Sequence, residues 1–126
     1  MSDLIQGVDF MSLGTEDLAR SIEFYRDTLG FKLTADRSPH NAEFETGTVT
    51  LSVLDPVKMG IGTFQANTNL TALHVADVAA ARTQLEAAGV TFTADTLDTG
   101  VCHMGFFTDP DGNALMLHNR YAPKGS

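Results

Sequence analysis

The sequence predicts an α+β protein built from two copies of one βαβββ module. An internal repeat indicates the duplication, because residues 30–36 and 89–95 are identical at four of seven aligned positions. The elements before these segments recur in the same order, with residues 10–13 matching 70–73 and Asp17 matching Asp77. Self-similarity at a fixed spacing is typical of a repeated structural unit, here of about 60 residues.

Four strands are predicted in each module from short runs of alternating apolar and polar residues bounded by turn signals. One strand precedes the helix of the module, and three follow it. The predicted strands cover residues 8–13, 31–36, 41–47 and 48–54 in the first module and 70–75, 90–94, 101–108 and 114–119 in the second. Residues 109–112, Asp-Pro-Asp-Gly, predict a turn between the last two strands, because Pro restricts φ and Gly readily adopts a positive φ.

One amphipathic helix is predicted after the first strand of each module. Asp17 and Asp77 occupy N-cap positions, where a side-chain oxygen accepts backbone N–H bonds. Gly30 and Gly89 occupy positions at which a helix commonly ends in a left-handed residue. The apolar stripes expected to face the core are Leu18, Ile22, Tyr25 and Leu29 in the first helix and Val78, Ala81, Leu85 and Ala88 in the second.

The whole chain, residues 1–126, is predicted to form a single domain. The modules cover about residues 7–55 and 69–120. Residues 56–68 are predicted to form the linker, because they hold glycines and polar residues without a clear period. A chain of 126 residues of which 43% are hydrophobic can build its own core without stapling.

Charge and cysteine content exclude several classes of partner. The 16 acidic and 8 basic side chains give a net charge of −8, which repels nucleic acids and anionic membrane surfaces. Cys102 is the single cysteine of the sequence, and residues 1–4 do not resemble the start of a secretory signal. No apolar stretch approaches the roughly 20 residues of a membrane span. We therefore expect a cytoplasmic protein whose partner is a small molecule.

Two motifs carry a family resemblance. Residues 23–31 read Glu-Phe-Tyr-Arg-Asp-Thr-Leu-Gly-Phe, and residues 109–117 read Asp-Pro-Asp-Gly-Asn-Ala-Leu-Met-Leu. Together with the repeated modules, they resemble the vicinal oxygen chelate superfamily, which includes glyoxalase I, extradiol dioxygenases and bleomycin resistance proteins. The resemblance extends from about residue 7 to residue 119. It implies curved mixed sheets around a cleft, and it implies a homodimer.

In metal-using members of this superfamily, each module supplies one ligand from its first strand, commonly His, and one from its last strand, commonly Glu. The resemblance maps these positions to Phe10, Ser52, Leu70 and Met116. Divalent cations of this kind prefer imidazole nitrogens and carboxylate oxygens, which these side chains do not offer. We therefore expect no metal or other cofactor. The expected site is a mainly apolar one that binds a ligand through Phe10, Ser52, Leu70, His74, Met116 and His118.

Three histidines support an alternative. Strand alternation places His74 on the same face as Leu70, and His118 on the same face as Met116. With His103 they could form a displaced divalent-metal site. Alternatively, His74 or His118 could act as an acid or base without a metal.

The sequence leaves open which side of the strand at residues 101–108 faces the cleft. Either Cys102 and Met104 or His103 and Gly105 face inward, because neighbouring strand residues point to opposite faces. For the same reason Cys102 and His103 cannot pair directly. Cys102 is expected to be a buried, unreactive side chain.

The remaining polar candidates are assigned to the surface. Glu43 and Glu45 share one face of a predicted strand and could supply a carboxylate base, but a solvated face is favoured on a chain this acidic. His40 follows Pro39 in a predicted loop and is expected to be exposed to solvent.

Two functional hypotheses are consistent with these residues. The first is a metal-free protein, similar to bleomycin resistance proteins, that binds a small apolar or aromatic molecule. The second is an enzyme of lyase or dioxygenase type, with either the displaced metal site or a histidine acid/base. The missing ligands favour the first hypothesis, and no catalytic residue is assigned.

Overall fold

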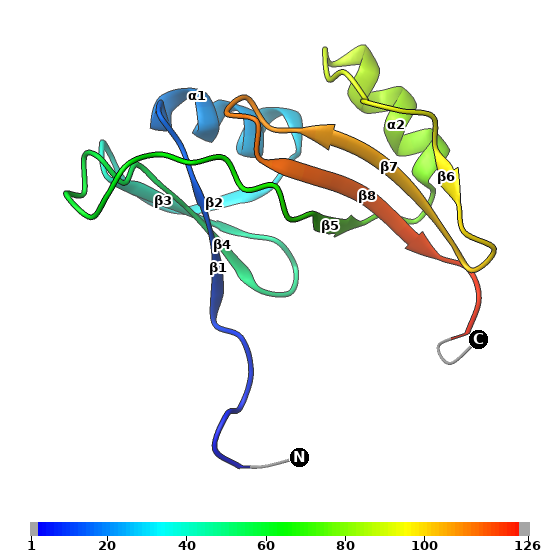
Figure 1. Ribbon diagram of the computed structural model, residues 1–126, viewed down its shortest axis with the longest axis horizontal. Helices are drawn as coiled ribbons and strands as arrows, with labels where there is room; N and C mark the ends of the chain where they lie inside the picture. The colour runs from blue at the N-terminus through cyan, green and yellow to red at the C-terminus, as the bar shows by residue number, and fades with distance from the viewer. Residues whose placement is uncertain (1–2, 124–126) are drawn as a thin grey trace. The chain divides into compact units, whose positions relative to one another are not determined.

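The computed structural model of the protein describes residues 3–123. Its elements follow the order strand, helix and three strands twice along the chain (Figure 1). The chain divides into two compact units between Gln65 and Ala66, inside the predicted linker, and we call these units module 1 and module 2. The predicted α+β fold with two βαβββ modules is confirmed.

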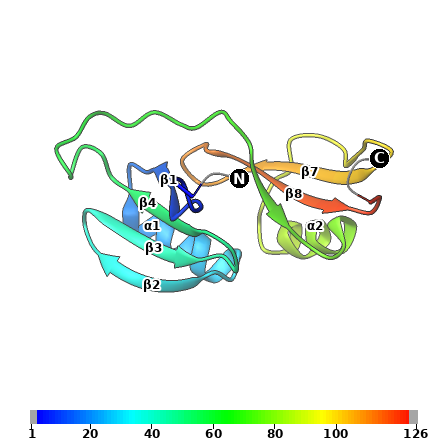
Figure 2. The same ribbon diagram turned by 90° about the horizontal axis from the view of Figure 1, so that it is seen from below.

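Module 1 forms one mixed four-stranded sheet with a helix on one face. Its strand order is β1-β4-β3-β2, in which β1 and β4 run parallel and the other pairs run antiparallel. The last strand of the module is therefore internal, and the first strand is at the edge (Figure 2). The elements are β1 (Phe10–Gly14), α1 (Leu18–Glu23), the π-helical turn η1 (Phe24–Thr28), β2 (Lys32–Arg37), β3 (Asn41–Glu45) and β4 (Thr50–Leu54).

The predicted residues at the two ends of the helical segment formed by α1 and η1 are confirmed. Asp17 Oδ1 accepts a hydrogen bond from Arg20 N at 3.1 Å. Gly30 has a φ of 82°, which a side chain would strain. Tyr25 from the predicted apolar stripe is fully buried, and its ring centroid lies 5.7 Å from that of Phe44 in β3. Burial of such a ring contributes about 2–3 kcal/mol to the stability of the module.

Module 2 repeats this arrangement. Its strand order is β5-β8-β7-β6, and β5 and β8 again run parallel. The predicted cap Asp77 precedes α2, and its Oδ1 accepts a hydrogen bond from Ala80 N at 3.1 Å. Among residues 3–123, no helix combines the length and the apolar character needed to span a membrane. The elements are β5 (Thr71–His74), α2 (Val78–Ala87), β6 (Leu97–Asp98), β7 (Cys102–Thr108) and β8 (Ala114–Arg120).

The strand predicted at residues 90–94 is wrong. This segment forms an isolated bridge between Phe92 and Phe107, and the fourth strand of the sheet is the two-residue β6. The Phe92 ring lies 5.2 Å from the ring of Phe107, and the guanidinium of Arg82 lies 4.7 Å from its centroid. Aromatic and cation–π packing against β7 and α2 therefore holds the segment in place of a longer backbone ladder.

The predicted turn between β7 and β8 is confirmed, and its side chains bond the backbone. Asp109 Oδ1 accepts hydrogen bonds from the backbone N–H groups of Asp111 and Asn113, each at 2.9 Å. Asn113 is fully buried, and its Nδ2 donates to Asp109 Oδ2 at 2.8 Å. Asn113 Oδ1 also accepts from Asn67 N at 2.8 Å. Asn113 thus ties the segment before β5 to the start of β8.

Replacing Asn113 with Ala is expected to lower the free energy of unfolding by about 2–3 kcal/mol, because it leaves buried polar partners unsatisfied. Chemical denaturation followed by circular dichroism measures this change. Asn69→Ala removes an exposed side chain nearby and should change stability by less than about 0.5 kcal/mol. Equal stability of the two variants would contradict the role given to Asn113.

Candidate functional site

Each sheet has one face covered by its helix and a second face that we call the open face. In module 1, Phe44 contacts Tyr25 and pairs with Leu51, which places both strand residues on the helix face. The adjacent cross-strand pair, Glu43 and Ser52, therefore lies on the open face.

The open face of module 1 carries a polar row. Ser12, Ser52 and Glu43 lie side by side across β1, β4 and β3. Arg37 Nη1 donates to Glu43 Oε1 at 3.0 Å, so this carboxylate is paired with a cation. Phe10, at the start of β1, shares the face of Ser12 by alternation and is 59% exposed. The suggested carboxylate base at Glu43 therefore has a surface ion-pair partner.

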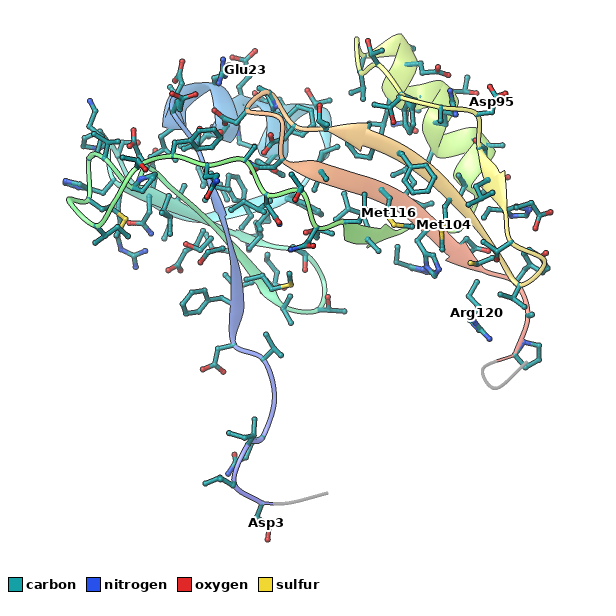
Figure 3. All side chains as sticks on the ribbon, in the orientation of Figure 1. Asp3, Glu23, Asp95, Met104, Met116 and Arg120 are labelled. Carbon is teal, nitrogen blue, oxygen red and sulfur yellow. The ribbon has the colours of Figure 1, made fainter. Side chains whose placement is uncertain are left out.

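The structure also shows which side of β7 faces α2. Val78 Cγ1 of α2 lies 3.5 Å from the position that a Cβ would take on Gly105, so Gly105 belongs to the helix face. Met104 and Phe106 therefore lie on the open face. Figure 3 shows Met104 and Met116 together on the side of the sheet away from α2. Of the two orientations that the sequence left open, the one with Cys102, Met104 and Phe106 on the open face is observed.

The open face of module 2 is apolar at its centre and carries imidazoles at one end. Met116 of β8 lies between Ala72 of β5 and Phe106 of β7 in the strand register. Two residues further along β8, His118 pairs with His74 of β5. Because β5 and β8 are parallel neighbours, these two imidazoles begin from backbones about 4.8 Å apart. They lie beside the apolar centre on the same face.

Three of the four positions that the resemblance assigns to metal ligands lie in strands, and the fourth, Leu70, lies just before one. Phe10 begins β1, Ser52 lies within β4, Leu70 directly precedes β5, and Met116 lies within β8. Their phenyl, hydroxyl, isobutyl and thioether groups provide neither imidazole nor carboxylate. Within residues 3–123, no group of three or more His, Cys, Asp or Glu side chains is placed to hold a metal ion. The side chains present do not fit the metal used by the superfamily.

The displaced metal site suggested for His74, His103 and His118 is not assembled. His103 lies on the helix face with Gly105, whereas His118 lies on the open face. The separation follows from strand alternation, because His103 pairs with Asn119 rather than with His118. The metal site suggested for these three histidines is therefore wrong. Of the three, only His74 and His118 share the open face.

His103 belongs to a different cluster, at the end of β6 and β7. Its Nε2 lies 3.4 Å from Asp98 Oδ2, and its ring centroid lies 4.9 Å from that of Tyr121. The Tyr121 hydroxyl donates to Asp98 Oδ1 at 2.7 Å. Hydrogen bonds from Gly100 N–H and then from Tyr121 lower the pKa of Asp98, and the bond to this carboxylate raises the pKa of Tyr121. The cluster connects β6 and β7 to the residue after β8.

Cys102 is buried, as predicted, and is only 4% exposed. Its Sγ lies 3.1 Å from Thr99 Oγ1. Because it occupies the opposite face of β7 from His103, no Cys–His pair forms. Its surroundings are those of a structural thiol.

Two further polar candidates lie at the surface of module 1. Glu45 is exposed, and its Oε1 accepts a hydrogen bond from Gly47 N at 3.0 Å, so the carboxylate stabilises the turn after β3. His40 is exposed in the loop between β2 and β3, as predicted.

A cavity of about 290 Å³ lies at the start of α1 in module 1. Asp17 in its wall caps α1, and Asp55 Oδ1 accepts hydrogen bonds from Val57 N and Lys58 N, each at 3.1 Å. Both carboxylates accept hydrogen bonds from backbone N–H groups. The acidic lining of this cavity also differs from the apolar lining that the sequence predicts for a ligand site. We therefore take the open face of module 2 as the candidate site. The cavity is lined by Glu16, Asp17, Leu18, Ala19, Ser38, Pro39, Asp55 and Lys58.

Arg120 is a candidate that the sequence analysis missed. It pairs with Cys102 and shares the open face with His118, two residues earlier on β8. Its Nη2 donates to Pro123 O at 3.0 Å, while its buried Nε has no hydrogen-bond partner among residues 3–123. The two-residue spacing from His118 was the available signal, but the burial of Nε is visible only in the structure.

Comparison with known proteins agrees with this geometry. A family model described as the Glyoxalase/Bleomycin resistance protein/Dioxygenase superfamily matches residues 7–117. The chain belongs to this superfamily. A search among curated proteins found no match.

Several solved structures share the fold. Lactoylglutathione lyase from Agrobacterium tumefaciens is 18% identical, with 90% of this chain and 93% of that chain covered and a TM-score of 0.78. A glyoxalase/bleomycin resistance protein/dioxygenase from Nocardioides is 23% identical, with 98% and 93% covered and a TM-score of 0.76. TnmS3, an antibiotic binding protein from Streptomyces sp. CB03234, is 25% identical, with 94% and 99% covered and a TM-score of 0.76.

Replacing Asp98 with Asn is expected to lower the pKa of Tyr121 toward its ordinary value, because a neutral amide no longer disfavours the tyrosinate. A raised folded-state pKa means that this bond stabilises the fold at neutral pH and that the stabilisation is lost as the pH rises through that pKa. Titration of the Tyr121 ¹³Cζ resonance measures the change. An unchanged titration in Asp98→Asn would contradict the coupling.

Proposed function

We propose that this protein binds a small apolar or aromatic molecule on the open face of module 2 without a metal. The observation that carries the proposal is the set of side chains at the four metal-ligand positions of the superfamily. These are Phe10, Ser52, Leu70 and Met116. A protein that lacks the metal ligands keeps a scaffold for binding but loses the Lewis acid that polarises a substrate.

The chemistry of the open face supports an apolar or aromatic ligand. Met104 and Phe106 of β7 offer partly exposed thioether and ring surfaces beside Met116 of β8, which is 5% exposed. Thioether side chains adapt to ligand shape, and a phenyl ring can pack against an aromatic ligand. An apolar floor with a few polar groups at its edge, here His74 and His118, is the usual composition of a small-molecule site.

The comparisons support a binding role without deciding it. The superfamily description includes resistance proteins as well as enzymes. TnmS3, whose structure matches over 94% of this chain, is an antibiotic binding protein. Phe10 and Ser52, on the open face of module 1, are kept as proposed ligand-binding residues of that module, as the resemblance to the superfamily implies.

We also propose that the protein is a homodimer, as the resemblance to the superfamily implies. The exposed edge strand β1 supports it, because Phe10 and Met11 are 59% and 43% exposed there. The net charge of −8 disfavours nucleic acid and anionic membranes as further partners. Sedimentation equilibrium should give a mass of about twice the 13.5 kDa of one chain. A mass of one chain would contradict the dimer.

A second candidate function is metal-independent acid/base catalysis. The side-by-side placement of His74 and His118 favours it, since imidazole can exchange a proton near neutral pH. The two functions differ in the fate of the bound molecule. A binding protein returns its ligand chemically unchanged, as mass spectrometry of the released molecule would show, whereas an enzyme returns a product.

Replacing Met116 with Gln is expected to weaken binding of the apolar fluorophore N-phenyl-1-naphthylamine by about five- to tenfold, because an amide is placed in the apolar floor. Fluorescence titration measures the dissociation constant. Met116→Leu keeps the volume and apolar character, so its affinity should stay within about twofold. Binding that is equally strong in both variants would place the ligand elsewhere, and no binding of this or a related aromatic probe to the unmodified protein would contradict the proposed function.

A further inference from the structure

The open face of module 2 has an unusual charge distribution for this chain. The sequence contains 16 acidic and 8 basic side chains. Even so, strand register places no Asp or Glu on the open face of β5, β6, β7 or β8 within the described residues. The same face carries His74, His118 and Arg120 near one end of the parallel pair β5 and β8. Asp98, the nearest acid in the register, pairs with His103 on the helix face.

We infer that the ligand of this face is an organic anion. Its apolar body lies on Met104, Phe106 and Met116. Its acidic group lies at His74, His118 and Arg120, which we call the anion end. The inference rests on the proposed function and specifies the class of ligand. The acidic group is a carboxylate, a sulfonate or an ionised phenol.

Among the three side chains of the anion end, Arg120 gives the most support for an anionic ligand. Figure 3 shows its side chain on the side of β8 away from α2. No carboxylate among residues 3–123 pairs with it, and one of its donors, Nη2, bonds the carbonyl of Pro123 at 3.0 Å. Its Nε is shielded and without an acceptor within the same residues. A guanidinium matches the planar geometry of a carboxylate, so an acidic ligand would pair with the η nitrogens at the end of the side chain, where the exposed bond to Pro123 lies.

The histidines place further donors beside the apolar surface. His118 lies two residues before Arg120 on the same face, a spacing of about 7 Å along the strand. His74 lies in register with His118, and Met104 flanks His118 on the other side. A flat anion of one or two rings therefore spans the distance from the apolar floor to the anion end. A neutral apolar ligand would gain nothing from these three donors.

Two fluorescent probes of nearly identical shape test this inference. The first is 8-anilinonaphthalene-1-sulfonate, and the second is N-phenyl-1-naphthylamine, which has the same aromatic body without the sulfonate. Arg120→Met is expected to weaken sulfonate binding by about tenfold or more and to leave binding of the neutral probe within about twofold, because the lost contact is a charge-assisted hydrogen bond. His74→Gln, at an exposed position, should weaken sulfonate binding selectively as well.

Arg26→Met is the matched control, because it removes the same charge from an exposed ion pair in module 1. It should leave both dissociation constants unchanged, which separates a local contact from the effect of net charge. Arg120→Lys retains a positive charge without the planar fork and should bind the sulfonate with intermediate affinity. Thermal unfolding of each variant gives its folded fraction, and binding is expressed per folded chain.

The possible outcomes separate the inference from the proposed function. Selective loss of sulfonate binding in Arg120→Met and His74→Gln would support the anion end. If Arg120→Met lowers the affinity for both probes equally, or leaves the affinity for the sulfonate unchanged, the inference is overturned. Binding of the neutral probe to the unmodified protein would still uphold the proposed function. If the unmodified protein binds neither probe, the proposed function fails and the inference fails with it.

Discussion

Parallel pairing between the first and last strands of each module is the constraint on which the rest of the structure depends. β1 pairs with β4, and β5 pairs with β8, so the last strand of each module becomes internal to its sheet. One side of that strand packs under the helix and is fully or almost fully buried, as at Val53 and Leu115. The other side carries the alternate residues, such as Ser52 and Met116, on the face away from the helix, where they are 7% and 5% exposed.

The motif at residues 109–113, Asp-Pro-Asp-Gly-Asn, stabilises this strand arrangement and has no chemical role in the site. Asp109 and Asn113 satisfy the turn that starts β8, and Asn113 also holds the backbone of Asn67 ahead of β5. These bonds position β8 beside β5 whatever side chain stands at position 116. The motif therefore identifies the superfamily but says nothing about whether a metal is bound. A similar fold occurs in a lyase and in an antibiotic binding protein.

The function we propose follows from the side chains that this scaffold presents. A thioether at position 116 and a phenylalanine at position 106 make the centre of the open face apolar, while the end of the same face carries imidazoles and a guanidinium. Acidic residues are abundant on this chain, but none occupies an open-face position of β5, β6, β7 or β8 among the described residues. An apolar floor next to cationic donors is complementary to an amphiphilic anion, and it requires no metal to hold one.

The sequence by itself determined the modules and the caps at Asp17 and Asp77, because these depend on short-range backbone chemistry and on residue type. It failed at residues 90–94, where aromatic packing of Phe92 replaces strand pairing. Only the tertiary structure decided that His103 lies on the helix face and that Arg120 shares the open face with His74 and His118. Alternation shows which residues of a strand share a face, but the packing of α2 on the sheet decides which face remains open.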